Sequence, residues 1–177
     1  GGLTYDTHRL YIADAIAAAD PTVDFSTTDA IYVVASKTSS IPFSPTFRGT
    51  PGVFVADGRN LGPAVTFGLD AYTWGRTIVP HETSHMFGLP DLYAFAGGHP
   101  FVGTWDYMGN VFQPTDLFAW HRLKLGWLDG SQFTCVGAGK ATDTTLTPLG
   151  STGGMTAVFA RTGPTTAVVV ENRQRVG

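Results

Sequence analysis

The chain has little charge and no long apolar run, and each shortage excludes a class of protein. Charged residues make up 14% of the 177 residues, and 11 Lys and Arg against 14 Asp and Glu give a formal net charge of −3. A nucleic-acid groove needs a clustered excess of cations, whereas the basic residues here are scattered singly, so we expect no nucleic-acid partner. No apolar run approaches the roughly eighteen residues that cross a bilayer, so we expect no membrane partner.

Cysteine is also nearly absent, with Cys135 as the single example. One thiol forms no internal disulfide and no redox motif. We expect Cys135 either to be a small half-buried side chain, or to form a disulfide with a cysteine elsewhere in a longer protein of which this chain is a part. The N-terminus has no basic flank followed by an apolar stretch, so no signal peptide is expected there, although the mature form of a secreted protein would begin in the same way.

The residues that are present suit one domain with a real core, since 43% are hydrophobic and the mean hydropathy is +0.06. The first third reads as one helix packed on a sheet. The expected elements are a helix over 6–19, a strand over 30–35 buried on both faces, an irregular loop over 36–52, and strands over 52–56 and 62–67 around an Asp57-Gly58 turn.

The informative motif is His81-Glu82-Thr83-Ser84-His85. Residues four apart share one face of a helix, so His81 and His85 can present two imidazoles to one metal ion. Glu82 lies on the same turn, where it can act as a general base towards a metal-bound water. With five histidines and two glutamates in the chain, a chance match to this pattern is rare.

The flanks of the motif predict where its helix begins and ends. Thr77 is placed to cap the helix, Pro80 falls in the first turn, and Gly88 is placed to end it in a left-handed conformation. A catalytic zinc usually takes three protein ligands and one water. A sharp turn at Gly88 can return Asp91 as the third ligand, although a carboxylate after proline also suits a turn or cap.

The motif resembles the H-E-x-x-H-x-x-G-x-x-D zinc motif of the immune inhibitor A peptidases and the snapalysins, within the metzincin-like group. The longer match HETSHMFGLPDLY, GTWDYMGN and PTDLFAWHRLKLGWL, over Pro80 to Leu128, resembles the immune inhibitor A type. The resemblance implies an α/β (α+β) fold, with a metzincin-like catalytic domain over 1–130 that holds a mixed sheet and an active-site helix. A β-rich extension follows over 131–177, and because that family's sheet normally continues, we expect a fragment of a larger protein.

The resemblance also implies roles for single residues. His81, His85 and Asp91 match the zinc ligands, and Glu82 matches the catalytic base and acid. Met108 matches a methionine packed beneath the metal. Some related families have a tyrosine two residues further on, where this chain has Asn110. The remaining candidates for oxyanion stabilisation are Tyr93, Tyr107, His99 and His121.

The last third is expected to hold a short helix and a small antiparallel sheet. Pro114-Thr115-Asp116 opens the helix and Gly126 ends it, with His121 expected as a packing or surface residue. The expected strands cover 144–147, 155–161 and 165–172.

Together these features predict a secreted, monomeric zinc endopeptidase with one catalytic Zn²⁺ and a protein or peptide substrate. The alternative is a zinc-containing binding or adhesion module without peptidase activity. A third hypothesis is hydrolysis of a non-peptide amide or ester. Should Asp91 be a turn residue, Asp106 and Glu171 are the fallback ligands. Calcium is not indicated, because Asp57, Asp106 and Asp116 lie in no recognisable loop pattern.

Overall fold

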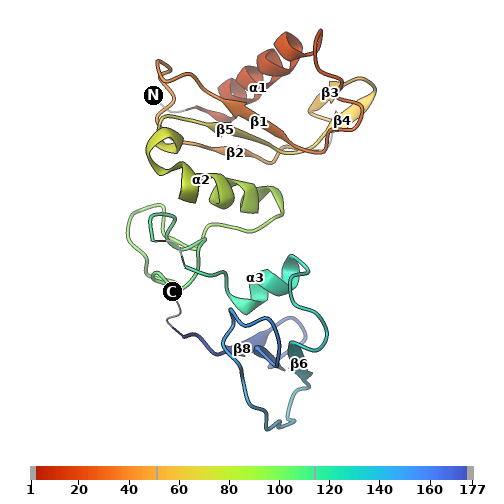
Figure 1. Cartoon of the computed structure of the whole chain (residues 1–177), viewed down its shortest axis with the longest axis vertical. Helices are drawn as coiled ribbons and strands as arrows, with labels where there is room; N and C mark the ends of the chain where they lie inside the picture. Colours follow the sequence, from red (N-terminus) through yellow and green to blue (C-terminus); the bar gives the residue numbers. More distant parts are fainter. Residues whose placement is uncertain (1–2, 51, 114, 175–177) are drawn as a thin grey trace. The chain divides into compact units, whose positions relative to one another are not determined.

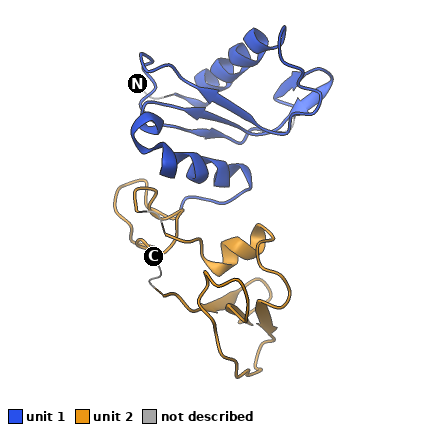
Figure 2. Ribbon diagram, viewed as in Figure 1, with its two compact units in different colours: residues 1–91 blue, residues 92–177 orange. Residues whose placement is uncertain are grey.

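The computed structural model describes residues 3–50, 52–113 and 115–174. The chain forms two compact units, residues 1–91 and residues 92–177 (Figure 2). Each contains a helix and a small sheet, so the fold class is α+β, as expected at this coarse level. The boundary between the compact units lies at residues 91 and 92, whereas the expected catalytic domain over 1–130 and β-rich extension over 131–177 stay a prediction.

Helix α1 spans Tyr5–Ala19 and confirms the helix predicted over 6–19. Thr4 caps it, because its hydroxyl accepts a hydrogen bond from the Thr7 backbone N–H while the Thr7 hydroxyl accepts one from the Thr4 N–H. Ile12 and Ile16 lie on its buried face and enter the core of the first unit. The helix therefore packs against the sheet of that unit (Figure 1).

The sheet beside this helix has the strand order β1-β5-β2. Strand β1 (Ile31–Val34) pairs parallel with β5 (Ala64–Phe67), and β2 (Thr46–Phe47) pairs antiparallel with β5. All four residues of β5 are buried. The expectation that the first strand is buried on both faces was wrong: β1 lies at an edge, and Tyr32 and Val34 are 49% and 65% exposed.

A hairpin joins β3 (Phe54–Ala56) to β4 (Arg59–Leu61). Asp57 and Gly58 form its two-residue loop, and their φ angles of 49° and 72° are both positive, as a type I′ turn requires. The turn was predicted correctly, but the strand that follows it is β4 rather than the strand at 64–67. The segment 36–52, predicted to be an irregular loop, contains strand β2. This strand has two residues, too few to show an alternating pattern of apolar and polar side chains.

The second unit contains helix α3 (Ala119–Lys124) and a sheet of β6 (Phe133–Val136), β7 (Ala157–Arg161) and β8 (Ala167–Glu171). Gly126, with φ of 71°, follows α3 as predicted. The helix begins later than expected, after its N-cap Phe118, and Pro114 lies outside the described residues.

The small sheet corrects two expectations about the last third. Strand β6 pairs parallel with β7, and β7 pairs antiparallel with β8, so the sheet is mixed rather than antiparallel. A parallel pair needs a long connection, and residues 137–156 supply it. The structure forms no strand over 144–147 in this described segment, so that expectation was wrong. Cys135 lies in β6 and is exposed rather than half-buried.

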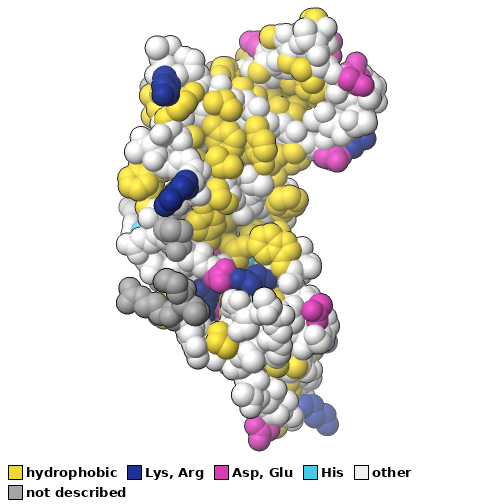
Figure 3. Space-filling view, in the orientation of Figure 1, with side chains coloured by type: hydrophobic (Ala, Val, Ile, Leu, Met, Phe, Trp, Pro, Cys, Tyr) yellow, Lys and Arg dark blue, Asp and Glu magenta, His cyan; other side chains and the backbone are white. Residues whose placement is uncertain are grey.

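Hydrophobic side chains reach the surface throughout the chain. On the face in Figure 3 they are widespread, and Lys and Arg side chains are scattered among them rather than gathered. Several aromatic side chains are strongly exposed, among them Phe43, Phe95 and Phe101. Within the described ranges, no helix has the length and apolar character needed to cross a membrane.

Gly62 provides a test of the packing around the first sheet. A Cβ at Gly62 would lie 1.9 Å from the Asp29 carbonyl oxygen, so the backbone would have to move. We expect Gly62→Ala to lower the free energy of unfolding by about 1–3 kcal/mol, measured by urea denaturation. Gly75→Ala is the matched control, because a Cβ there meets nothing within 4 Å. Equal stability of the two variants would contradict this packing.

Candidate metal centre

Helix α2 (Asp70–Met86) carries the His-Glu motif. It begins well before Thr77, which was wrongly expected as the N-cap: the Thr77 hydroxyl instead donates to the Trp74 carbonyl, 3.0 Å away, inside the helix. Pro80 also lies in the helix interior rather than in its first turn. Trp74 has non-helical angles (φ −116°, ψ 19°), so the helix is kinked between Asp70 and the motif.

The end of α2 agrees with the prediction for Gly88. Gly88 has a φ of 85°, and its N–H donates to the His85 carbonyl at 2.9 Å. The Leu89 N–H donates to the Ser84 carbonyl at 3.2 Å, which completes the C-terminal cap in which Gly88 has the left-handed backbone conformation. Because glycine alone adopts this conformation without strain, Gly88 reverses the chain and returns the segment that carries Asp91.

The structure brings the three predicted ligands together. Asp91 Oδ1 lies 3.1 Å from His81 Nε2 and 3.2 Å from His85 Nε2. The donor atoms of all three residues lie within 4.8 Å of one another. His81 and His85 are buried, and their rings meet edge to face with centroids 4.8 Å apart. Two imidazole nitrogens and one carboxylate oxygen therefore converge on one point.

The spacing of these donors suits a small divalent cation. A tetrahedral zinc ion with bonds of about 2.0–2.1 Å holds its ligand atoms about 3.3 Å apart. The two distances from Asp91 Oδ1 lie close to that value. The same distances also suit hydrogen bonds from protonated imidazoles, so the spacing fits a metal without requiring one.

A contact outside the donor set fixes the tautomer of His85. His85 Nδ1 lies 2.7 Å from the Leu89 carbonyl oxygen. Since a carbonyl only accepts hydrogen bonds, Nδ1 carries the proton and donates. In the neutral ring the lone pair is then on Nε2, the atom that faces Asp91, and this is the arrangement that a metal-binding histidine requires.

Charge at the site follows from burial and from these contacts. Burial raises the pKa of the Asp91 carboxyl, but hydrogen bonds and charge from His81 and His85 outweigh it and bring that pKa well below its usual range. Burial lowers the pKa of the His85 imidazole, but Asp91 and the Leu89 carbonyl outweigh it and raise that pKa. Asp91 is therefore held as a carboxylate, the form that binds a cation.

Glu82 lies beside this donor set without belonging to it. It is buried in helix α2, and its carboxylate Oε2 accepts a hydrogen bond of 2.7 Å from the Thr46 hydroxyl. Burial raises the pKa of the Glu82 carboxyl, with the Thr46 hydrogen bond and the charges of His81 and His85 opposing it. A carboxylate with a raised pKa is suited to accept and return a proton.

Sequence reasoning did not identify Thr46. It lies in the two-residue strand β2, within the stretch that was expected to be an irregular loop. No motif marks it, because its contact with Glu82 depends on how β2 pairs with β5 and how α2 packs on that sheet. Thr46 lies 36 positions before Glu82, so no local sequence pattern indicates the contact between them.

The other predicted residues lie in the second unit. Met108 is fully buried, and His99 Nδ1 donates to the Gly109 carbonyl at 2.6 Å. His121 is buried, as a packing histidine would be, and its Nδ1 lies 3.0 Å from Asp106 Oδ2. The role of Met108 beneath a metal, and oxyanion roles for His99, His121, Tyr93 or Tyr107, stay predictions.

The fallback and calcium candidates have structural partners instead. Asp57 accepts from the Phe25 N–H, Asp116 pairs with Arg122, and Glu171 accepts from the Ala119 N–H and pairs with Arg173. Among the residues that the structure describes, His81, His85 and Asp91 form the single group of three or more potential ligands.

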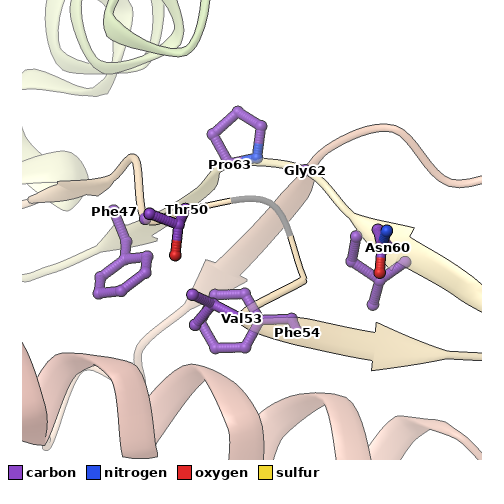
Figure 4. Close-up of a pocket in the computed structure, with 9 residues that line it drawn as sticks. Phe47, Thr50, Val53, Phe54, Asn60, Gly62 and Pro63 are labelled. Carbon is purple, nitrogen blue, oxygen red and sulfur yellow. The ribbon is translucent and has the colours of Figure 1, made fainter.

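The structure has two cavities whose linings contain none of the predicted ligands. The first, of about 130 Å³, is an apolar pocket in the first unit, lined by residues such as Phe47, Val53 and Phe54 (Figure 4). The second is an open groove of about 840 Å³ in the second unit, beside Trp120 and Phe159. Neither is lined by a predicted ligand or by Glu82, so neither supports a different site for the predicted chemistry.

Comparisons with protein-family models, with curated proteins and with solved structures found no match for this chain. The resemblance to the immune inhibitor A family therefore rests on the sequence motifs and stays a prediction.

The buried Asp106 carboxylate gives a test by pH. Oδ1 accepts from the Met108 N–H, and Oδ2 accepts from the Phe118 N–H and from His121. Burial raises the pKa of this carboxyl, but these hydrogen bonds outweigh it and lower the pKa below the value in the unfolded chain. The ionised form therefore adds stability above about pH 4, and this is lost as the pH falls through the folded pKa.

We expect Asp106→Asn to lower the free energy of unfolding by about 1.5–3 kcal/mol at pH 7, since it removes hydrogen bonds to a charged group. The difference from the wild type should shrink as the pH falls below about 4. Urea denaturation across this range checks both, with Asp14→Asn, on the exposed side of α1, as the control. A difference that is the same at every pH would contradict the assignment.

Proposed function

We propose that this protein is a zinc-dependent endopeptidase. The observation that carries the proposal is the convergence of His81, His85 and Asp91 on one point, next to the buried Glu82 carboxylate. The proposal includes the metzincin-like fold, secretion, a monomeric state and a protein or peptide substrate, as the motif resemblance implies. The α+β architecture and the position of the motif on α2 support it.

His81, His85 and Asp91 would hold the metal through Nε2, Nε2 and a carboxylate oxygen. A bound zinc ion supplies Lewis acidity, which lowers the pKa of a coordinated water and polarises a substrate carbonyl. Glu82 accepts the proton of the attacking water and returns it to the leaving amine. The Leu89 carbonyl holds the His85 ring in the binding tautomer.

The same residues favour a hydrolase over a binding module. A structural zinc site usually has four protein ligands and needs no base. The described residues here offer three ligands, and Glu82 adds a buried carboxylate whose pKa is raised. A site with three protein ligands leaves a position for water, and a nearby base is useful only if that water reacts.

Zinc affinity tests the donor set. Purified protein should contain close to one zinc per chain by elemental analysis. We expect Asp91→Asn to weaken zinc binding tenfold or more in a competition titration, because the amide carries no charge to offset the metal. Asp14→Asn makes the same chemical change on an exposed side chain and should leave the affinity unchanged. Unchanged affinity in Asp91→Asn would make Asp91 a turn residue and move the third ligand elsewhere.

Glu82→Gln tests the reaction. The amide keeps the size of the side chain but removes its basicity, so hydrolysis of casein should fall by about 10²–10⁴-fold or more while zinc binding is retained. A chelator should abolish the wild-type activity, and added zinc should restore it. Cleavage by Glu82→Gln at the wild-type rate would show that Glu82 is not the base.

A further inference from the structure

Two contacts connect residues 44–46, at the start of strand β2, to helix α2. Near the start of the helix, Asp70 accepts hydrogen bonds from the Ser44 hydroxyl at 2.5 Å and from the Ser44 N–H at 3.1 Å. Near its motif, the Thr46 hydroxyl lies 2.7 Å from Glu82 Oε2 and 2.9 Å from the Glu82 carbonyl oxygen. The two contacts join the same elements, and only the second involves the base.

The direction of the Thr46 side chain is set by the strand. Successive residues of a strand point to opposite faces, and Phe47 points towards α1 (Figure 4). Its ring lies 5.0 Å from that of Tyr5 in α1. Thr46 therefore faces α2. It pairs with Val65 in the sheet, and as a β-branched residue it has a restricted χ1. Its hydroxyl is thus held in place before any substrate arrives.

We propose that Thr46 is the positioning residue for Glu82, and this proposal rests on the proposed function. Glutamate has three side-chain torsions, so a base at this position needs a partner to select one conformer. The Thr46 hydroxyl binds Oε2 and leaves Oε1 for the proton transfer. Strand β2 thereby controls the geometry of the base, whereas α2 and the segment after Gly88 carry the predicted metal ligands.

The kinetic test compares Thr46→Val, Thr46→Ser and Ser44→Ala with the wild type. Thr46→Val keeps the shape and removes the hydroxyl, so kcat should fall about 10- to 100-fold, the range for a lost hydrogen bond to a charged group. KM and zinc affinity should change less than about twofold. Thr46→Ser should restore most of kcat. Ser44→Ala removes the hydroxyl hydrogen bond of the other contact, keeps its N–H hydrogen bond, and should leave kcat near the wild-type value.

A second readout does not depend on activity. In crystal structures, Glu82 should have one side-chain conformer in the wild type and in Thr46→Ser, and several conformers or a displaced one in Thr46→Val. Thr46→Ala also lacks the hydroxyl and replaces Thr46→Val if that variant does not fold. In the Glu82→Gln background, Thr46→Val should lower the residual rate no further, because the group it positions is gone.

Two results would overturn the proposal. One is a Glu82 side chain that keeps the same single conformer without the hydroxyl. The other is a kcat that falls equally in Ser44→Ala and Thr46→Val, which would mean that both contacts only stabilise the fold. A wild-type protein that binds no zinc or cleaves no peptide contradicts the proposed function instead, and the crystallographic comparison still decides whether Thr46 holds Glu82.

Discussion

The imidazoles of His81 and His85, both buried on one face of helix α2, share one carboxylate oxygen of Asp91, and the geometry of the candidate site depends on this contact. Helical periodicity alone places His81 and His85 together, but Asp91 reaches them because Gly88 adopts a φ of 85° and reverses the chain. The Leu89 carbonyl, within the same turn, holds the His85 ring. One short segment therefore supplies the three predicted ligands, sets their spacing and determines the tautomer of His85.

Electrostatics shifts the pKa values of the two carboxyl groups of the candidate site in opposite directions. Both lose solvation by burial, which raises a carboxyl pKa. Asp91 faces both imidazoles directly, and its pKa falls well below its usual range. For Glu82, burial outweighs the Thr46 hydrogen bond and the charges of the two imidazoles, so its pKa rises. Carboxylates whose pKa values are pushed apart in this way suit a permanent anionic ligand and a base that exchanges protons.

The sequence predicted the parts of the site that depend on local periodicity, and missed those that depend on pairing across the chain. The spacing of His81, His85 and Gly88 is a property of one helix and its end, so it could be read directly. The start of the helix could not be predicted in this way. Helix α2 begins at Asp70, which is hydrogen-bonded to Ser44, and continues past Pro80. Strand β2 is two residues long and becomes a strand only by pairing with β5, so Thr46 had no local signature.

The proposed function requires that His81, His85 and Asp91 hold one zinc ion. Anomalous diffraction at the zinc edge from crystals of the zinc-loaded protein tests it most directly. We expect one strong peak per chain, about 2.0–2.2 Å from His81 Nε2, His85 Nε2 and a carboxylate oxygen of Asp91, with no fourth protein ligand. A peak bound by other residues, or no peak between these three side chains at a saturating zinc concentration, would contradict it.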